Sequence, residues 1–481
     1  MKLLLINPGY YKLLQLPLSL ASIAAFVREK GNHEVKVVDE NVGQKLSNFK
    51  DFKPDLVGIT SATPLFVDAL RCANESKKLF PNALTIIGGI HVTSLPEHTM
   101  QNYSEFDFGV VGEGEQTVLE LCNHFQEKGK LSKEELTGIN GLVFKKEGKI
   151  IRTPKRELIQ NLDDIPIPAR DLFEMKEFYT QPRAVIRGIM KRTIQIMSSR
   201  GCPYDCAFCA SARMWERKFR FHSPERVIKE IEHLIETYNI SALFFVDDTF
   251  IANKDRVKRI CDLMIERGIN KRIVWSCQLR ANLVDKEIVD KIKSAGCVQA
   301  EFGLESGNER VLSMIKGNSV TIKQNTEAIR ICKEAGLRVL ANFVVGNPSE
   351  TREEIIDTLN FIKNNPLNFV HPHIATPFPG SRYWEIAKQQ GKINENNVDW
   401  TRFQMSQVQN NVVVADKITE KELYDLYSEI SAFTAKINKN SFVVGDVKEF
   451  LNLKTVKRVL RTPKHIVKFG PKIIKQVITK K

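Results

Sequence analysis

Short apolar runs alternate with segments of helical periodicity along most of this 481-residue chain. Before residue 129 the apolar runs are KLLLIN, EVKVVD, DLVGIT, LTIIGG and FGVVGE, and helical patterns such as LSLASIAAFVREKG lie between them. Such alternation is typical of an α/β fold, a parallel sheet with crossover helices on both faces. We therefore predict a doubly wound, Rossmann-like domain over residues 1–128, followed by a linker over 129–190 where Pro166 and Pro168 require an extended chain.

The same alternation resumes after the linker. Six further runs, TIQIMSS, ALFFVDD, RIVWSCQ, QAEFGLES, LRVLANFVVG and FVHPHIATPF, are each followed by a helical segment. Six strand-helix units predict a partial barrel of the eight-unit type over residues 191–405, with a wide lateral opening. Residues 406–481 are predicted to form a helical C-terminal extension that ends in a basic tail.

Composition indicates a globular chain, with 42% hydrophobic and 27% charged residues. The opening MKLLLINPGYY has too short an apolar stretch for a secretory signal, so we expect a cytoplasmic protein. Its nine cysteines are then reduced, which favours metal ligands or core residues over disulfides. Six of them occur singly and are predicted to be core residues: Cys72, Cys122, Cys261, Cys277, Cys297 and Cys332.

The net charge of +14 is concentrated at the C-terminus. Residues 454–481 contain ten Lys or Arg and no acidic residue, which leaves +4 for the rest of the chain. Nucleic acid is therefore not the expected partner. Apolar residues recur at helical spacing in this tail, and Pro463 and Pro471 divide it into short amphipathic pieces, which predicts peripheral attachment to the inner face of the membrane. Packing against the barrel and a nucleic-acid-binding arm are the alternatives.

The stretch SSRGCPYDCAFCA places three cysteines, Cys202, Cys206 and Cys209, directly after the first barrel strand. Gly201 and Pro203 break helical periodicity, so we expect a loop at the carboxyl face of the barrel, where barrel active sites lie. Structural zinc sites and most iron-sulfur clusters use four protein ligands, whereas three thiolates leave one coordination position open for chemistry. A zinc site completed by His222 and a chance cluster of core cysteines are the alternatives.

The loops after the first, third, fourth and fifth strands gather at the carboxyl edge of the predicted N-terminal sheet, where such sheets bind ligands. Their sequences are NPGYY, TSATP, GGIHVT and GEGE. Glycines there allow the backbone to approach a large flat ligand, although each could equally form a tight turn. The candidate residues are Ser61, Thr63, Gly88, Gly89, His91, Gly112, Glu113 and Gly114. His91 has a second interpretation, a hydrogen bond within its loop.

The CxxxCxxC motif after the first strand of a six-unit barrel resembles the signature of radical S-adenosylmethionine (radical SAM) enzymes. The resemblance implies a 4Fe-4S cluster on the three cysteines, whose open iron binds S-adenosylmethionine, and cleavage of that cofactor to a 5'-deoxyadenosyl radical. The glycine loops and the DDIPIPARDLF linker resemble the cobalamin-binding subgroup, over residues 1 to about 405. The DxHxxG motif that donates a histidine to cobalt elsewhere is absent, so we expect cobalamin without that ligand; a relic domain without cobalamin is the alternative.

The resemblance also implies contacts to S-adenosylmethionine along the barrel. Phe208 corresponds to the aromatic position whose backbone contacts adenine. VDDTF resembles the acidic motif that binds the ammonium group, which implicates Asp247 and Asp248, with helix capping as the alternative. GLESG offers Glu305 and Ser306 to the ribose hydroxyls.

Two later motifs complete this set. VVGNPSET resembles the glycine motif that contacts adenine, with Gly346 at its centre, and TPFPGS, which contains Pro379, resembles the loop that closes over the cofactor. The whole pattern predicts methylation of an unactivated carbon, the hard chemistry belonging to the cofactors. Cyclisation, as in the anaerobic magnesium-protoporphyrin ester cyclase group, is the alternative.

The expected partners are a small-molecule or lipid substrate and an electron donor such as flavodoxin or ferredoxin. Two other classes remain open. A transfer-RNA methylthiolating enzyme should carry further N-terminal cysteines, but Cys72 and Cys122 are isolated there. A non-catalytic metal or cofactor sensor would not cleave S-adenosylmethionine.

Overall fold

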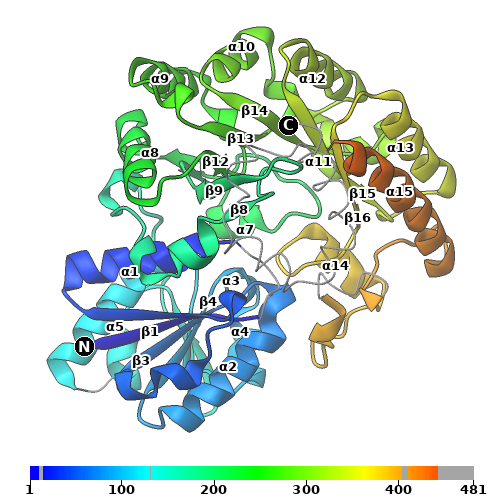
Figure 1. Cartoon of the computed structure of the whole chain (residues 1–481). Coiled ribbons are helices and arrows are strands. Elements are labelled where there is room, and N and C mark those ends of the chain that lie inside the picture. Colours follow the sequence, from blue (N-terminus) through cyan, green and yellow to red (C-terminus); the bar gives the residue numbers. More distant parts are fainter. Residues whose placement is uncertain (10–14, 130–131, 404–409, 442–481) are drawn as a thin grey trace.

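The computed structural model of this chain describes residues 1–9, 15–129, 132–403 and 410–441 (Figure 1). Two seven-stranded sheets dominate it, one in each half of the chain. The first has the strand order β2-β1-β3-β4-β5-β6-β7. Its strands are β1 (Lys2–Asn7), β2 (Glu34–Asp39), β3 (Leu56–Thr60), β4 (Leu84–Gly88), β5 (Phe108–Val110), β6 (Leu142–Lys146) and β7 (Lys149–Arg152).

Strands β1 to β5 are parallel and match the five predicted runs. Strands β6 and β7 are antiparallel, and they extend this sheet with residues that the sequence analysis assigned to the linker. The structural first half therefore reaches Arg152. A hairpin of this kind adds to a sheet edge without a crossover helix, so the alternation of strands and helices gives no signal for it.

Helices cover both faces of the first sheet, which confirms the doubly wound prediction (Figure 1). Alternate residues of β1 enter different layers: Leu3 and Leu5 pack with α1 and α5, whereas Leu4 and Ile6 pack with α2. The helices are α1 (Leu18–Gly31), α2 (Phe66–Leu79), α3 (Ile90–Ser94), α4 (Pro96–Asn102), α5 (Glu115–Lys128) and α6 (Lys133–Leu136).

The connection between the halves, residues 153–190, lies against both. The Arg170 guanidinium is fully buried and donates to Glu230 of the second half at 2.7 Å, while Ala169 donates its backbone N–H to the Ala21 carbonyl of the first half at 2.9 Å. Such contacts fix the orientation of one half against the other.

The second sheet has the order β16-β15-β14-β13-β12-β9-β8. Six of its strands are parallel and consecutive, and β9 does not pair with β16, so the barrel stays open as predicted. The strands are β8 (Pro182–Arg183), β9 (Lys191–Ile196), β12 (Ala242–Phe245), β13 (Val274–Leu279), β14 (Cys297–Glu305), β15 (Arg338–Val345) and β16 (Phe369–Ile374).

Helices surround the outer side of the second sheet (Figure 1). They are α8 (Pro224–Tyr238), α9 (Lys254–Glu266), α10 (Lys286–Ser294), α12 (Ile322–Glu334) and α13 (Arg352–Asn364). Helices α7 (Ser211–Trp215), α11 (Glu309–Lys316) and α14 (Arg382–Gln389) also belong to this half, and α7 contacts α3 of the first half. A short ribbon of β10 (Ser199–Arg200) and β11 (Arg220–Phe221) flanks the cysteine loop. All six singly placed cysteines are buried, as predicted.

Helix α15 (Glu420–Asn440) packs beside β16 and forms the helical part of the predicted C-terminal extension (Figure 1). The Asn438 side chain secures this position, since it accepts from the Val370 backbone N–H at 2.8 Å and donates to the Val370 carbonyl at 2.9 Å. The basic tail, residues 454–481, lies outside the described residues. None of the helices within the described ranges combines the length and hydropathy that a bilayer crossing requires.

Candidate active site

A cavity of about 700 Å³ lies where the carboxyl ends of the barrel strands face the loop edge of the N-terminal sheet. Residues of both halves line it. The N-terminal half contributes Ala62, Thr63, Pro64 and Ile90. The barrel contributes the three cysteines together with Phe208, Asp248, Thr249, Gln278, Arg280, Glu301, Glu305, Lys316, Asn342, His373 and Pro379, among others.

Cys202, Cys206 and Cys209 all reach this cavity, and each is partly buried. Their loop is held by backbone bonds: Ala207 donates to the Ile315 carbonyl at 2.8 Å, and Cys209 donates to the Cys206 carbonyl at 3.0 Å. Burial raises the pKa of the Cys209 thiol to about 12. A metal that binds there must therefore displace a tightly held proton.

No three His, Cys, Asp or Glu side chains of the described ranges are grouped as a single metal ion would require. A four-iron cluster makes a different demand, because its cysteines bind separate irons. The zinc alternative also lacks its fourth ligand, since His222 lies beside a different cavity and pairs with Asp163 at 3.2 Å. Three thiols around one cavity suit a cluster with an open position.

The two aspartates of VDDTF have different environments. Asp247 is 1% exposed and accepts from the Ser198 backbone N–H at 3.1 Å and from the Ser198 and Ser199 hydroxyls. Asp248 lines the cavity and accepts from Ser211 at 2.8 Å. Burial raises the pKa of both carboxyl groups. Only Asp248 is therefore placed to meet a ligand, while Asp247 organises the chain before the cysteine loop.

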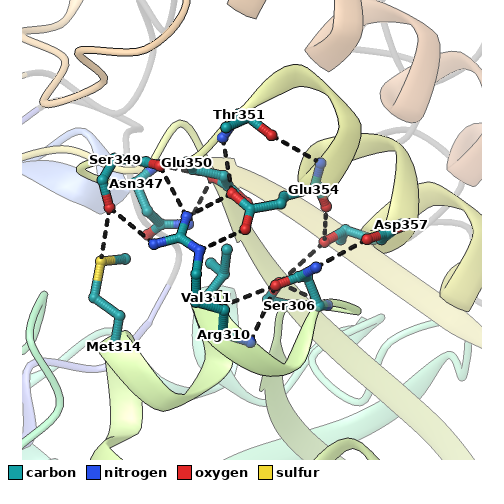
Figure 2. Close-up of polar contacts among 12 residues, drawn as sticks. Ser306, Arg310, Val311, Met314, Asn347, Ser349, Glu350, Thr351, Glu354 and Asp357 are labelled. Atoms are coloured by element: carbon teal, nitrogen blue, oxygen red, sulfur yellow. Dashed lines mark hydrogen bonds and ion pairs between the residues drawn. The ribbon is translucent and has the colours of Figure 1, made fainter.

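Glu305 and Ser306 also separate. Glu305 lines the cavity with a backbone φ of 64°, and Lys316 pairs with it at 3.3 Å. Ser306 is fully buried and uses its hydroxyl to accept from the Asn308 backbone N–H at 3.1 Å and to contact Thr358 at 3.2 Å. Figure 2 shows Ser306 within the polar contacts of the α11 and α13 termini. Its role in the structure is to hold that turn.

Gly346 directly follows β15, and Pro379 lies in the loop after β16. Pro379 lines the cavity. Gly346 has a φ of +77°, and a Cβ atom there would come within 2.7 Å of the Leu423 side chain on α15. Glycine is required at this position because the backbone both turns and passes close to that helix. The following Asn347 and Glu350 bond to one another at 2.9 Å, so the motif is also a turn that begins α13 (Figure 2).

Arg280 and Lys316 are cavity residues that the sequence analysis did not identify. Arg280, 6% exposed, lies 3.6 Å from the Cys206 sulfur through Nη1 and over the Tyr204 ring at 3.6 Å. Its position directly after β13 was the available signal, because the carboxyl ends of β12 to β16 open on the cavity. A guanidinium beside the cysteine loop can offset negative charge gathered there.

The loop edge of the N-terminal sheet has a second, smaller cavity of about 200 Å³. The candidate residues Gly88, Gly89, Gly112, Glu113 and Gly114 line it. A Cβ atom on Gly88 or Gly112 would meet open space, whereas one on Gly89, with a φ of +97°, would lie 2.6 Å from the Ser61 carbonyl oxygen. The loops thus present bare backbone to the cavity at Gly88 and Gly112.

Three N-terminal candidates have structural partners. Ser61 is buried and contributes its backbone to the Gly89 turn. His91 is fully buried, stacks on Phe66 with 3.8 Å between ring centroids, and contacts the Thr63 hydroxyl at 3.1 Å through Nδ1. Burial lowers the pKa of His91 to about 3. His91 is thus a neutral core residue that lines neither cavity, and its hydrogen bond goes to Thr63 of the preceding loop and not to its own loop; Thr63 reaches the larger cavity.

Buried ion pairs join the two halves beside the cavities. Arg200, two residues before Cys202, donates to Glu113 at 2.7 Å and to Glu115 at 2.6 Å. Arg220 also bonds Glu113, at 2.9 Å. Burial raises the pKa of Glu115, but the Arg200 charge and hydrogen bonds outweigh it and the net shift is downward. The GEGE loop and the cysteine loop are therefore held together by charge.

Comparisons with known proteins agree with this arrangement. The radical SAM superfamily model matches residues 196–362, and the B12 binding domain model matches residues 10–122. An uncharacterized methyltransferase of Pyrococcus horikoshii is 39% identical over 377 residues, which are 77% of this chain and 78% of that protein. The anaerobic magnesium-protoporphyrin IX monomethyl ester cyclase of Rubrivivax gelatinosus is 27% identical over 76% of this chain and 65% of its own length.

Among solved structures, TsrM of Kitasatospora setae, a radical S-adenosylmethionine methyltransferase, superimposes with a TM-score of 0.69 at 16% identity. The match covers 96% of this chain and 99% of TsrM, in a structure that holds tryptophan and an S-adenosylmethionine analogue. Another TsrM structure holds cobalamin and a [4Fe-4S] cluster. At this identity the likeness establishes the fold. With the two family models and the 39% identical relative, it confirms the resemblance found in the sequence: the chain belongs to the B12-binding radical SAM enzymes.

Proposed function

We propose that this chain transfers a methyl group to a carbon of a small-molecule substrate, in the cavity between its two halves. The observation that supports the proposal best is that the three cysteines and two loops of the B12-binding half, around Thr63 and Ile90, line one cavity. When bound, a 4Fe-4S cluster with S-adenosylmethionine supplies hydrogen abstraction and cobalamin supplies the methyl group. The protein's part is to hold these groups and the substrate together and exclude water.

In this proposal Cys202, Cys206 and Cys209 hold the cluster, and Arg280 offsets its negative charge. Asp248 and Glu305 bind polar groups of S-adenosylmethionine, since both carboxyl groups line the same cavity as the cysteines. Phe208 and Pro379 complete the cofactor side of that cavity. Gly346 contributes the turn of its loop.

Cobalamin is assigned to the glycine loops around Gly89, Gly112 and Gly114, with Ser61 and Thr63 supporting their turns. His91 is neutral and buried in an aromatic cluster, which agrees with binding of cobalt without a histidine from this chain. The B12-binding half then comprises residues 1–152, the connection 153–190 and the radical SAM half 191–405, followed by the C-terminal extension.

Methyl transfer is preferred to cyclisation because the 39% identical relative is named a methyltransferase and the cyclase is more distant at 27%. A small-molecule substrate agrees with the tryptophan bound in TsrM. An electron donor of the flavodoxin or ferredoxin type would supply the reducing electron.

The experiment that tests the proposal uses protein reconstituted anaerobically with iron, sulfide and hydroxocobalamin and then desalted. We expect about one retained equivalent of cobalamin, cleavage of S-adenosylmethionine, and transfer of a labelled methyl group to a small molecule. A desalted protein that retains no cobalamin but still cleaves S-adenosylmethionine would contradict cobalamin-dependent methyl transfer.

The basic tail carries a separate part of the proposal, peripheral attachment to an acidic membrane that presents a lipid substrate. Each Lys or Arg near such a surface contributes about 1 kcal/mol, and residues 454–481 contain ten. Full-length protein should sediment with anionic liposomes in a salt-sensitive way, and a chain ending at Asn452 should not. Equal sedimentation of both would remove the membrane from the proposal.

A further inference from the structure

The barrel strands carry different side chains on their two faces. Paired residues of neighbouring parallel strands point to the same side, so the register assigns each residue to a face. The outward face is apolar and buried under the helices, with Phe245, Cys277, Ala300, Phe302, Phe343 and Val370. The inward face is largely polar, with Gln195, Ser276, Gln278, Gln299, Glu301, Asn342, His371 and His373 among Phe244, Leu340 and Val344. Barrel interiors are usually filled by branched apolar residues instead.

Four of the inward polar residues line the cavity below the cysteine loop: Gln278, Glu301, Asn342 and His373, one from each of β13 to β16. We call these four residues the polar floor. Tyr427 of α15 closes the cavity next to them, with its hydroxyl 3.4 Å from the Pro372 carbonyl oxygen. The floor therefore lies in the same space as the cysteines but on different strands from Asp248.

Glu301 is the charged member of the floor and is 9% exposed. Its Oε1 atom accepts from the Gln299 amide at 3.1 Å, the one hydrogen bond recorded for this carboxyl group within the described ranges. Burial raises the pKa of Glu301 to about 7, against a smaller lowering by the Gln299 hydrogen bond and the Arg187 charge. One side of a buried carboxyl group thus faces the cavity without a protein donor.

Most other buried glutamates within the described ranges have cationic partners; Glu350 does not, but it bonds Asn347 at 2.9 Å and lines neither cavity. Glu230 pairs with Arg170 at 2.7 Å and Arg226 at 3.0 Å, and Glu113 pairs with two arginines. Glu305 has Lys316 at 3.3 Å. A buried carboxyl group without such a partner costs stability, so its position in a cavity indicates a ligand that supplies the missing donor.

We infer that the polar floor binds a hydrogen-bond-donating group of the substrate, an amine or a hydroxyl, through the Glu301 carboxylate, and so holds the reacting carbon toward the cysteine loop. The inference rests on the proposed methyl transfer and narrows its substrate class. Gln278 and Asn342 offer further amide acceptors. Burial lowers the pKa of His373, so its neutral ring also has an acceptor nitrogen. A substrate made only of hydrocarbon would leave all of these groups unpaired.

The first test is stability, which does not require the substrate. Glu301→Leu should raise the melting temperature by about 2–4 °C, because leucine removes a buried carboxyl group that has no cationic partner and so removes its desolvation cost. A group that is kept for binding at the expense of stability should behave in this way. Glu230→Gln, the matched change at a paired buried glutamate, should lower it. A fall for Glu301→Leu as large as that for Glu230→Gln would assign Glu301 to the structure and overturn the inference.

The second test follows the methyl group. Reconstituted protein is given S-adenosylmethionine with a radiolabelled methyl group and a small-molecule extract of the source cells, and labelled products are treated with acetic anhydride. We expect each labelled product to gain an acetyl group, as amines and hydroxyls do. In the Glu301→Leu protein the rate of methyl transfer should fall about tenfold more than the rate of S-adenosylmethionine cleavage, because the change removes a hydrogen bond to the substrate. Glu236→Leu, at an exposed position of α8, is the control.

The outcomes separate the two proposals. Label in a product that acetic anhydride leaves unchanged, or equal transfer by the Glu301→Leu and Glu236→Leu proteins, would overturn the role of the floor and leave methyl transfer standing. Cleavage of S-adenosylmethionine with no labelled product would overturn methyl transfer, and the inference with it.

Discussion

In the first sheet, residues of β1 pack against helices on both faces, Leu3 and Leu5 on one side and Leu4 and Ile6 on the other. In the second sheet only the outer face is apolar, and the inner face carries Gln278, Glu301 and Asn342. The first sheet has no free face, so ligands meet it at its edge, through glycine backbone. The second meets ligands through side chains. The first sheet therefore recognises a ligand by its shape, and the second recognises a ligand by its chemical groups.

The largest expected effect comes from a change in the cysteine loop of the barrel half, where side chains contact the ligands. Cys206→Ala should reduce S-adenosylmethionine cleavage by more than about 100-fold, beyond the effect of an outer-shell change. Cys261→Ala, a buried core cysteine, is the matched control and should retain cleavage while losing about 1 kcal/mol of folding stability. Iron content and product analysis measure both. Undiminished cleavage by the Cys206→Ala protein would remove the cluster from this loop.

The junction of the two regions is the next point to test. Arg200→Met leaves Glu115 buried without its charge partner and should cost about 3–5 kcal/mol of folding free energy. Arg267→Ala, which removes an exposed pair with Glu232 at 3.0 Å, should cost less than about 1 kcal/mol. Denaturant unfolding measures both, and equal costs would argue against a charge clasp between the halves.

This junction has a pH dependence of known sign. The folded pKa of Glu115 lies below its ordinary value of 4.5. Its stabilisation is therefore complete above that value and disappears as the pH falls through the lower folded pKa. The stability difference between wild-type and Arg200→Met proteins should shrink below pH 4.5. A difference that stays constant through this range would indicate lost packing and not lost charge.

A change in backbone shape should affect the first region alone. Gly89→Ala forces a side chain at a φ of +97° and against the Ser61 carbonyl, at a cost of about 1–3 kcal/mol. We expect weaker retention of cobalamin and unchanged iron content. Gly129→Ala, also at positive φ but with open space around its Cβ position, should retain cobalamin. Equal retention by the two variants would contradict backbone recognition at the loop edge.

The smallest expected effect comes from Asp248, a side chain of the barrel cavity, and distinguishes its role from that of Asp247. Asp248→Asn should weaken S-adenosylmethionine binding about tenfold, close to 1.4 kcal/mol, with cobalamin retention unchanged. Asp247→Asn should instead lower the melting temperature, because that carboxylate accepts from the Ser198 backbone N–H at 3.1 Å and from two hydroxyls. Calorimetric titration and thermal unfolding separate the two; weaker binding by both would mean that the aspartates act as one group.

Local patterns were sufficient for the two sheets and the cysteine loop. Strands β1 to β5 and the six barrel strands lie where apolar runs predicted them, because a buried strand consists of consecutive apolar residues and is visible in the local sequence. The hairpin of β6 and β7 did not follow from the pattern, since its burial depends on pairing with β5. Cys202, Cys206 and Cys209 were identifiable because three ligands lie within eight residues.

The sequence by itself determined which residue types reach the edges of the two sheets, because strand ends and loop glycines are local features. Only the tertiary structure decided which side chains face a cavity. Asp248 faces the cavity and Asp247 does not, because the hydroxyl groups of Ser198 and Ser199, far away in the chain, donate hydrogen bonds to the Asp247 carboxylate. His91 is in the core because Phe66 covers it. The position of Glu301 in the cavity could not be predicted from the sequence, because the cavity forms only where β13 to β16 and other distant segments meet and leave space between them.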